Sequence, residues 1–371
     1  MKVNFPFIIA GGGPTGLFLG CLLAQKNIPF IILEAKDAPS KHSRSIGIHP
    51  PSLHLFSKTG LLDDFLHEGN KVDTGIACIG NRKVGEIHFS ELVHPFPFIL
   101  TLSQSITERL LEEKLRILAP QALIRNCAVT DFSMHKDYVS VETSQGKTYT
   151  GHWLVGCDGK ESIIRKKAKI AFNGELYPDT YMMGDFEDTF AKRNEAVVHL
   201  CKDGLIESFP HGKNVRRWVV KTRRYIEHPT LDELLGEIEQ RLCTKPDELT
   251  NSMLSSFRVQ RMLADTFVKD RVILAGDAAH VVSPIGGQGM NLGWLDAFEL
   301  AQHAENLSQE ILAEWETSRR KSAEIAAKRA AFNMRMGRSF KSETFRGLLV
   351  KTLLSKPIRK FLMKQFTMDG L

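Results

Sequence analysis

The sequence predicts an α/β protein: a Rossmann-like domain with an inserted, mainly antiparallel β-sheet, followed by C-terminal helices. Three observations predict this fold. A buried strand near the N-terminus runs directly into a glycine-rich turn and a helix, and residues 271–297 repeat the order strand, glycine turn and helix. Between these units, residues 171–261 contain several short strand candidates, which together predict an antiparallel sheet.

The composition is that of a soluble globular protein. The 371 residues are 43% hydrophobic and 25% charged, and no apolar run reaches the roughly 18 residues of a membrane span. Residues 1–10 are too short for a signal peptide. The net charge of +6 is too mild to predict a nucleic-acid partner. The six cysteines lack C-x-x-C spacing, so we expect no metal site, no disulfides and a cytoplasmic location.

The N-terminal unit has the pattern of a dinucleotide-binding turn. The strand candidate 3–10 leads into G-x-G-x-x-G, whose glycines allow a tight turn, close approach of a pyrophosphate and close packing of helix on strand. Glu34 ends the next strand at the spacing of an acid that binds ribose hydroxyls. The motif fits FAD and NAD equally well. The predicted contacts are Gly11, Gly13, Pro14, Thr15, Gly16, Glu34 and Ala35.

Residues 271–297 form the second unit. The apolar run 271–275 predicts a buried strand, and Asp277 follows at its carboxyl end, where open α/β sheets bind ligands. A carboxylate accepts hydrogen bonds, so it suits sugar or polyol hydroxyls. Three glycines in four positions then precede a helix, and they leave a backbone that a planar ligand can approach. The predicted contacts are Gly276, Asp277, Pro284, Gly286, Gly287, Gln288, Gly289, Met290 and Asn291.

A third segment, residues 152–166, follows a buried strand with the pattern C-D-G-x-x-S-x-x-R. Asp158 comes directly after the strand, and Ser162 and Arg165 fall on the next helical turn, whose start offers N–H donors. We expect Asp158 and Arg165 to contact a cofactor. The alternative for Asp158 is that it only caps the helix.

These three segments, in this order, resemble the single-component (group A) flavoprotein monooxygenases, the para-hydroxybenzoate hydroxylase-like family. The resemblance implies that Asp277 holds the ribityl chain of FAD and that the turn from Pro284 to Gly289 lies against the isoalloxazine ring. It places Met290 and Asn291 beside the pyrimidine edge of that ring. It also implies that the Asp-Gly of the third segment is tied to both FAD and the nicotinamide cofactor.

Two further residues are implied by local matches to the family. Arg44 lies in a loop where the family places an arginine near the flavin phosphates and ring, and Gln104 matches a flavin-contacting glutamine. The alternatives are a solvated surface arginine and a polar residue at a helix N-terminus, respectively.

The resemblance also implies a reaction. NADPH or NADH reduces FAD, O2 adds to the reduced ring, and the resulting flavin C4a-hydroperoxide hydroxylates an aromatic or polycyclic small molecule. The chemistry is carried by the flavin, so the sequence assigns no catalytic residue. No second G-x-G-x-x-G motif is present, which fits a family without a dedicated nicotinamide domain.

The predicted domains are discontinuous. Residues 1–72, 103–170 and 262–305 form the FAD-binding domain, 73–102 and 171–261 form the substrate-binding sheet, and 306–371 form a helical segment. A pocket between two domains is a common small-molecule site. The candidates for contact with the substrate are Met182, His199, Phe209 and Trp218, and plain core packing is the alternative for each.

The C-terminal tail is amphipathic and basic, with leucine and phenylalanine at helical spacing and a break at Pro357. Such a stripe either packs on its own protein or makes weak contact with a membrane surface through residues 340–366, which would place the protein peripherally and suit a lipophilic substrate.

Two rival functions stay open at this stage. One is a related flavoenzyme, a halogenase or an isoprenoid reductase; Trp218 lacks the Trp-x-Trp-x-Ile-Pro segment of the halogenases. The other is a non-catalytic, escort-type binding protein that shares the glycine motif, against which the intact Asp158 and Asp277 argue.

Overall fold

The structure is a computed structural model that describes residues 4–39, 45–190, 192, 194–339 and 343–371. One sheet carries the nucleotide-type turn. Its strand order is β17 (Val268–Lys269), β18 (Val272–Leu274), β11 (Thr148–Gly156), β1 (Phe5–Ala10), β2 (Phe30–Leu33) and β8 (Leu123–Ile124), with β10 (Val139–Thr143) and β9 (Val129–Met134) attached beside β11. The four strands β18, β11, β1 and β2 pair in parallel, so their carboxyl ends meet at one edge.

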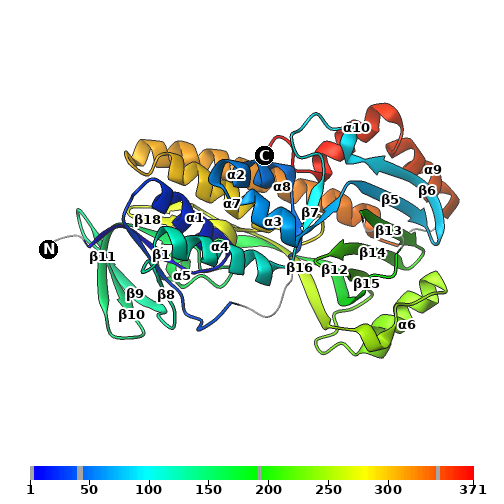
Figure 1. The fold of residues 1–371 in the computed structure, drawn as a ribbon, viewed down its shortest axis with the longest axis horizontal. Coiled ribbons are helices and arrows are strands. Elements are labelled where there is room, and N and C mark those ends of the chain that lie inside the picture. Colours follow the sequence, from blue (N-terminus) through cyan, green and yellow to red (C-terminus); the bar gives the residue numbers. More distant parts are fainter. Residues whose placement is uncertain (1–3, 40–44, 191, 193, 340–342) are drawn as a thin grey trace.

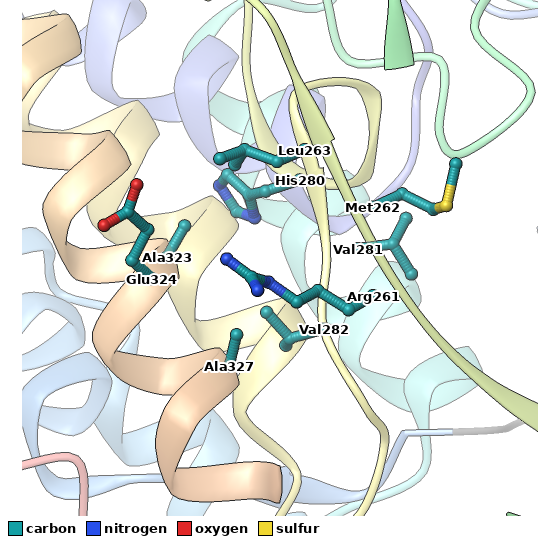
Figure 2. Close-up of a pocket in the computed structure, with 9 residues that line it drawn as sticks. All are labelled: Arg261, Met262, Leu263, His280, Val281, Val282, Ala323, Glu324 and Ala327. Carbon is teal, nitrogen blue, oxygen red and sulfur yellow. The ribbon is translucent and has the colours of Figure 1, made fainter. Parts of the chain in front are cut away.

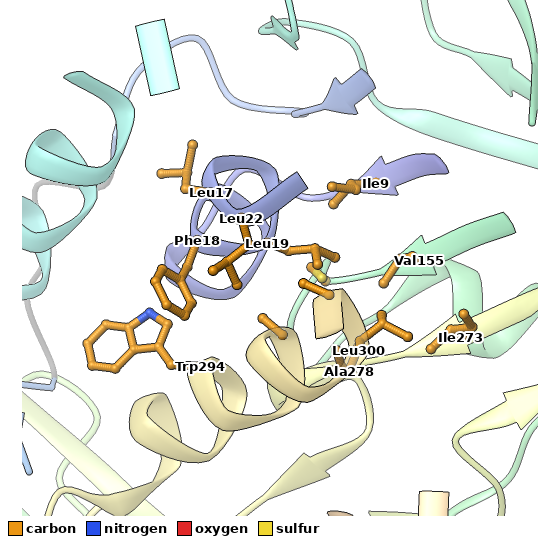
Figure 3. Packing of buried hydrophobic residues seen from close by; sticks show 14 of the residues in the cluster. Ile9, Leu17, Phe18, Leu19, Leu22, Val155, Ile273, Ala278, Trp294 and Leu300 are labelled. Atoms are coloured by element: carbon orange, nitrogen blue, oxygen red, sulfur yellow. The ribbon is translucent and has the colours of Figure 1, made fainter. Parts of the chain in front are cut away.

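Helices cover this sheet because its strands are apolar on both sides. All four residues of β2 and all three of β18 are buried. Figure 3 shows α1 (Pro14–Gln25) packed between the sheet and α7 (Gln288–Gln302), with Phe18 of α1 facing Trp294 of α7. The other helices of this region are α2 (Pro50–Thr59), α3 (Leu62–Glu68), α4 (Gln104–Leu118) and α5 (Ile163–Lys167).

A second sheet lies beside the first (Figure 1). Its order is β19 (His280–Val281), β16 (Met253–Ala264), β12 (Phe172–Glu187), β15 (Val215–Thr222), β14 (Gly204–His211), β13 (Glu195–Cys201), β5 (Thr74–Ile79) and β6 (Arg82–His88). Its pairings are antiparallel except for β13 with β5. A small sheet of β3 (Gly47–Ile48), β7 (Ile99–Thr101) and β4 (Asn70–Val72) joins the two regions, and three short 3-10 helices lie at Phe89–Glu91, Glu248–Thr250 and Gly276–Ala278.

The two faces of the second sheet bury different clusters. On one face, Met182 and Trp218 pack against α6 (Leu231–Leu242). On the other, Met183 and Leu205 pack with Ile285, which belongs to the segment leading into α7. We call these the α6 face and the turn face. Successive strand residues point to opposite faces, which is why Met182 and Met183 separate.

Three helices end the chain: α8 (Gln309–Gly337), α9 (Glu343–Leu353) and α10 (Lys356–Phe366). Val350 of α9 packs on the turn face, Met363 of α10 is buried with Ile87 and Phe89, and Figure 1 shows both helices over β5 and β6. Leu348 and Phe361 remain exposed. Pro357 stands in the first turn of α10, where its missing N–H is tolerated.

The predicted fold class is confirmed: an α/β unit with parallel strands, an inserted mainly antiparallel sheet and C-terminal helices. The domain boundaries stay a prediction, although residues 74–88 pair with the 172–264 strands as one sheet. Within the described residues, no helix has the length and apolar character needed to cross a membrane.

Candidate functional site

The glycine turn after β1 is fixed by contacts that leave no room for side chains. A Cβ on Gly16 would lie 2.0 Å from the carbonyl oxygen of Gly11, and one on Gly11, whose φ is +105°, would lie 2.4 Å from that of Cys157. Gly11 therefore holds the turn against β11, and Gly16 holds α1 against the turn. These two glycines are required by the fold itself.

Gly13 differs, because a Cβ added there would meet nothing within 4 Å. Gly13 is the N-cap of α1, and no side chain caps this helix end. Space and free N–H donors therefore meet at a positive helix terminus, which suits an anion. Glu34 lies next to this turn and accepts hydrogen bonds from the backbone N–H groups of Gly12 (2.5 Å) and Lys36 (2.8 Å). Ala35 lies in the exposed turn that follows.

Asp277 lies in the 3-10 turn after β18, at the carboxyl edge of the first sheet. Its side chain is exposed, yet enough protein surrounds it that burial raises the pKa of its carboxyl, with His280 and Lys160 opposing the rise. No hydrogen bond or ion pair to Asp277 is found among the described residues. Gly289 faces it, since a Cβ there would lie 4.0 Å from its Oδ1.

Asp296 of α7 holds the turn that carries Asp277 in place through buried hydrogen bonds. Its carboxylate accepts hydrogen bonds from the Gly276 N–H (2.9 Å), from His280 Nε2 (2.7 Å) and from Arg319 Nε (3.0 Å). All these side chains are buried. Burial favours the neutral acid, but these partners hold the pKa of Asp296 below its ordinary value.

Asn291 ties the glycine-rich turn before α7 to the small sheet. Its Oδ1 accepts from the His49 N–H (2.9 Å), and its Nδ2 donates to the carbonyls of Gly47 (2.9 Å) and Gly287 (2.8 Å). Gly286 and Gly287 adopt φ of +95° and +67°, which favour glycine. The geometry of the turn therefore explains why glycine stands at positions 286 and 287 and asparagine at position 291.

The other predicted contact residues around this turn differ in how far they are exposed. Pro284 is exposed, and its carbonyl accepts from the Gly287 N–H (2.9 Å). Met290 is half-buried against the core of the first sheet. Gln288 is buried and donates from Nε2 to the Gln365 carbonyl (3.2 Å). Thr15 of α1 packs closely on Gly276, where a Cβ would lie 2.6 Å from its Oγ1.

The two carboxylate oxygens of Asp158 have different surroundings. Its Oδ2 accepts from the N–H groups of Ile163 (2.7 Å) and Ile164 (3.2 Å), so it caps α5 as the alternative supposed. Its Oδ1 is buried and has no partner among the described residues. Burial raises the pKa of this carboxyl. One oxygen caps the helix, and the other has no partner among the described residues.

Arg165 joins the Asp158 segment to the Asp277 segment. Its guanidinium donates to the carbonyls of Ala278 (2.8 Å) and Lys160 (2.6 Å) and stacks 3.7 Å from the centre of the Phe172 ring. It is buried. These contacts make Arg165 a positioning residue for the turn that carries Asp277.

Replacing Arg165 with lysine is expected to lower the free energy of unfolding by about 1.5–3 kcal/mol, because one ammonium cannot span both carbonyls or stack on the ring. Urea unfolding of the purified proteins measures this. Lys166→Ala is the control, since its exposed ion pair with Glu161 is expected to contribute less than about 1 kcal/mol. Equal stabilities for the Arg165 variant and the control would contradict this role.

For two of the predicted residues, the structure gives little information on contact with a cofactor. Gln104 opens α4, after the N-cap Ser103, and its Nε2 donates to Glu108 Oε1 (2.8 Å). Arg44 lies outside the described residues.

Two of the buried polar atoms without a hydrogen-bond partner among the described residues lie at these turns, Asp158 Oδ1 and Gln288 Oε1, and others lie elsewhere, as the Tyr181 hydroxyl does. The His49 ring lies beside Gly287, and backbone hydrogen bonds with Gly286, Gly287 and Phe366 oppose the effect of burial on its pKa. Burial lowers the pKa of His49 to about 4, so its ring is neutral. Buried polar groups without partners are rare in folded proteins, so Asp158 Oδ1 and Gln288 Oε1 are candidates for contact with a ligand.

The sequence profile described as FAD binding domain matches residues 4–330. The chain belongs to the FAD binding domain family. Both glycine turns, Asp158 and Asp277 fall inside the matched region, and the resemblance found in the sequence is confirmed at the level of the family.

Named relatives share this family. Rifampicin monooxygenase of Streptomyces venezuelae is 32% identical over 308 residues, which are 80% of this chain and 63% of that protein. Dialkyldecalin synthase of Streptomyces rugosporus is 31% identical over 305 residues, 79% of this chain and 63% of that protein. The crystal structure of p-nitrophenol 4-monooxygenase PnpA from Pseudomonas putida DLL-E4 has a TM-score of 0.88 at 25% identity, covering 100% of this chain and 98% of that one.

The chain spans 61–63% of the length of the curated relatives with the strongest matches. FAD fits the described residues. An anionic pyrophosphate suits the open end of α1 at Gly13, and hydroxyl donors suit Asp277, which only accepts while ionised. The individual cofactor contacts remain predictions.

The four candidate substrate residues do not share one face. Met182 and Trp218 lie on the α6 face, and Phe209 packs on the turn face. His199 is half-buried, and its Nδ1 lies 2.9 Å from the Gly80 carbonyl oxygen. The structure therefore brings only Phe209 to the face shared with Ile285, and substrate contact by any of the four stays a prediction.

A separate hollow lies between β16, β19 and α8, and no predicted cofactor contact lines it (Figure 2). Figure 2 shows the Arg261 side chain in this space, between His280 and the α8 residues Ala323 and Ala327. His280, which lines this hollow, also bonds Asp296.

Sequence reasoning missed Asp296, His49 and Arg319. The available signal for Asp296 was a charged residue within the otherwise apolar run G-W-L-D-A-F, where burial demands a partner.

Proposed function

We propose that this chain is an FAD-dependent monooxygenase that consumes NAD(P)H and O2 and hydroxylates an aromatic or polycyclic small molecule. The observation that carries the proposal is the juxtaposition at the α7 turn. Its glycines lie beside Gln288, whose buried Oε1 has no described partner, and its Ile285 packs on the turn face of the second sheet. A flavin ring against this turn would therefore lie near a largely apolar sheet surface, where an aromatic molecule fits.

When bound, FAD would supply the redox chemistry, taking a hydride from the nicotinamide and passing electrons to O2. The protein would hold it. Gly13 and the N-terminus of α1 would receive the pyrophosphate, and Asp277 would accept hydrogen bonds from the ribityl hydroxyls. The N-terminus of α7, capped by Gly287 in the left-handed region, would place its positive end at the ring, where it stabilises developing negative charge.

The packing of the C-terminal helices supports the alternative in which the tail packs on its own protein. Val350 and Met363 are buried against the second sheet. We therefore include in the proposal that residues 343–366 cover β5 and β6 rather than a membrane; residues 340–342 of the predicted membrane-contact stretch lie outside the described residues. The cysteine pattern supports a cytoplasmic location.

Family membership alone does not specify oxygen transfer, because one relative above is named a dialkyldecalin synthase. The test is anaerobic titration of the FAD-loaded protein with NADPH and NADH, with and without phenolic and quinolone compounds, followed by O2 and mass spectrometry. We expect one compound to accelerate flavin reduction and to gain one oxygen atom. Flavin that neither nucleotide reduces with any compound would contradict the proposal, and a halogenated or saturated product would support the rival flavoenzymes.

A further inference from the structure

Glu207 of β14 is a carboxyl group on the turn face that the fold does not use. Leu205 and Phe209, its neighbours two positions away on the same strand, both pack on this face, so Glu207 points the same way. It stands opposite Val198 of β13 and Val219 of β15, which belong to the same apolar cluster. A carboxyl group therefore interrupts a row of apolar side chains.

No hydrogen bond or ion pair engages the Glu207 carboxyl within the described part of the chain, although the side chain is only partly exposed. Burial alone raises the pKa of this carboxyl to about 7. Buried carboxyls without partners are costly, and they cluster at functional sites. A purely structural glutamate would be expected to have a donor nearby, as Asp185 and Asp188 of the same sheet have in Arg217 and Arg216.

The other charged and titratable groups on the same face have partners of their own or are neutral, and Arg217 and His211 both pair with Asp185. Tyr181 of β12 has a buried hydroxyl without a described partner, and burial with nearby acids raises its pKa, so it stays neutral. Lys221 of β15 pairs with Asp179 (3.6 Å), which Arg338 also binds (2.6 Å). These cations are already committed to Asp179. Ile285 and Met334, packed over the face from the α7 turn and α8, carry no charge.

We propose that Glu207 binds the ring hydroxyl of an aromatic substrate and shares one proton with it. This inference rests on the proposed function. When the proton moves, the phenol O–H bond breaks, an O–H bond forms on the Glu207 carboxylate, and the electron pair stays on the phenolate oxygen. A phenolate ring is richer in electrons than a phenol ring, so it is the better acceptor of an electrophilic oxygen. Glu207 would thus be a catalytic base, with its proton affinity matched to neutral pH.

The sharing of one proton has a measurable consequence. Above the pH at which both free groups are ionised, the complex must take up one proton to form, so its affinity falls about tenfold for each further pH unit. In Glu207→Gln the amide donates an N–H to the phenolate without proton uptake. Its affinity should therefore become independent of pH in the same range.

The test is binding of p-nitrophenol, whose phenolate absorbs visible light, to the FAD-loaded protein between pH 6 and about 9. Affinity should fall with rising pH in wild type and in Glu207→Asp, which keeps a carboxylate. It should also fall in the control Glu305→Gln, which changes an exposed carboxylate elsewhere. It should not fall in Glu207→Gln. Flavin content checks that each variant is folded.

Each outcome decides between the two proposals. A Glu207→Gln variant with wild-type flavin content and the wild-type pH slope would overturn the role of Glu207 and leave the proposed function standing. If the FAD-loaded wild type binds neither p-nitrophenol nor any other hydroxylated aromatic compound of the panel, the proposed function fails and this inference fails with it.

Discussion

Replacing Gly16 with alanine is expected to destabilise the protein by about 3 kcal/mol or more, whereas the same change at Gly13 should leave the fold intact and weaken FAD binding. At Gly16 the new methyl group would lie 2.0 Å from a backbone oxygen, so the turn or α1 must move. At Gly13 it would point into open space. The expected loss of stability there is within about 1 kcal/mol, the effect of alanine at an N-cap.

The open space at Gly13 is where the pyrophosphate is predicted to lie. A methyl group there is expected to introduce about 1–3 kcal/mol of steric conflict with the cofactor, which is roughly a tenfold or greater loss of FAD affinity. Urea unfolding of the apoprotein and FAD titration separate the two effects. A Gly13→Ala protein with wild-type FAD affinity would show that the cofactor does not approach this turn.

Replacing Asp296 with alanine is expected to lower the free energy of unfolding by about 3–5 kcal/mol, because it removes the buried partner of the Arg319 guanidinium and leaves it only Glu299. It also removes the acceptor for the Gly276 N–H and for His280. The Asp277 turn should therefore loosen. The control is Glu299→Ala, since Glu299 also pairs with Arg319 (2.7 Å) but is only half-buried, and its removal is expected to lower the free energy of unfolding by about 1 kcal/mol or less.

The stabilisation by Asp296 depends on pH in one direction. Its folded pKa is depressed, so the stabilisation is fully present above the unfolded value of about 3.9 and is lost as pH falls through the folded pKa. Acid unfolding of Asp296→Asn should therefore be less steep below about pH 4 than that of wild type. Equal steepness, or equal stability of the Asp296 and Glu299 variants, would contradict the central position given to this carboxylate.

The local elements were largely predictable from the sequence. The strand, glycine turn and helix order of both cofactor units appears in β1–α1 and β18–α7 as expected, and the start of α6 is fixed by the local capping box of Thr230 and Glu233. Such features depend on neighbouring residues, so one stretch of sequence contains the whole signal.

Long-range features were not predictable in the same way. The 12-residue strand β16 was missed because its Ser, Arg and Gln residues give little apolar alternation, and the strand is held instead by pairing with β12 and β19. The parallel pairing of β5 with β13 joins segments more than a hundred residues apart. The isolation of Glu207 likewise depends on Val198 and Val219 from neighbouring strands, which no local pattern reveals.

The measurement that tests the account most directly is the bound flavin content of Asp277→Ala, compared with wild type and with Asp203→Asn, in which another exposed carboxylate is changed. Asp277 has no bonding partner among the residues that the structure describes, so the apoprotein should unfold as wild type does. We expect the variant to lose most of its FAD on purification while Asp203→Asn stays as yellow as wild type. Wild-type flavin content in Asp277→Ala would contradict the assignment of the Asp277 turn to the cofactor site.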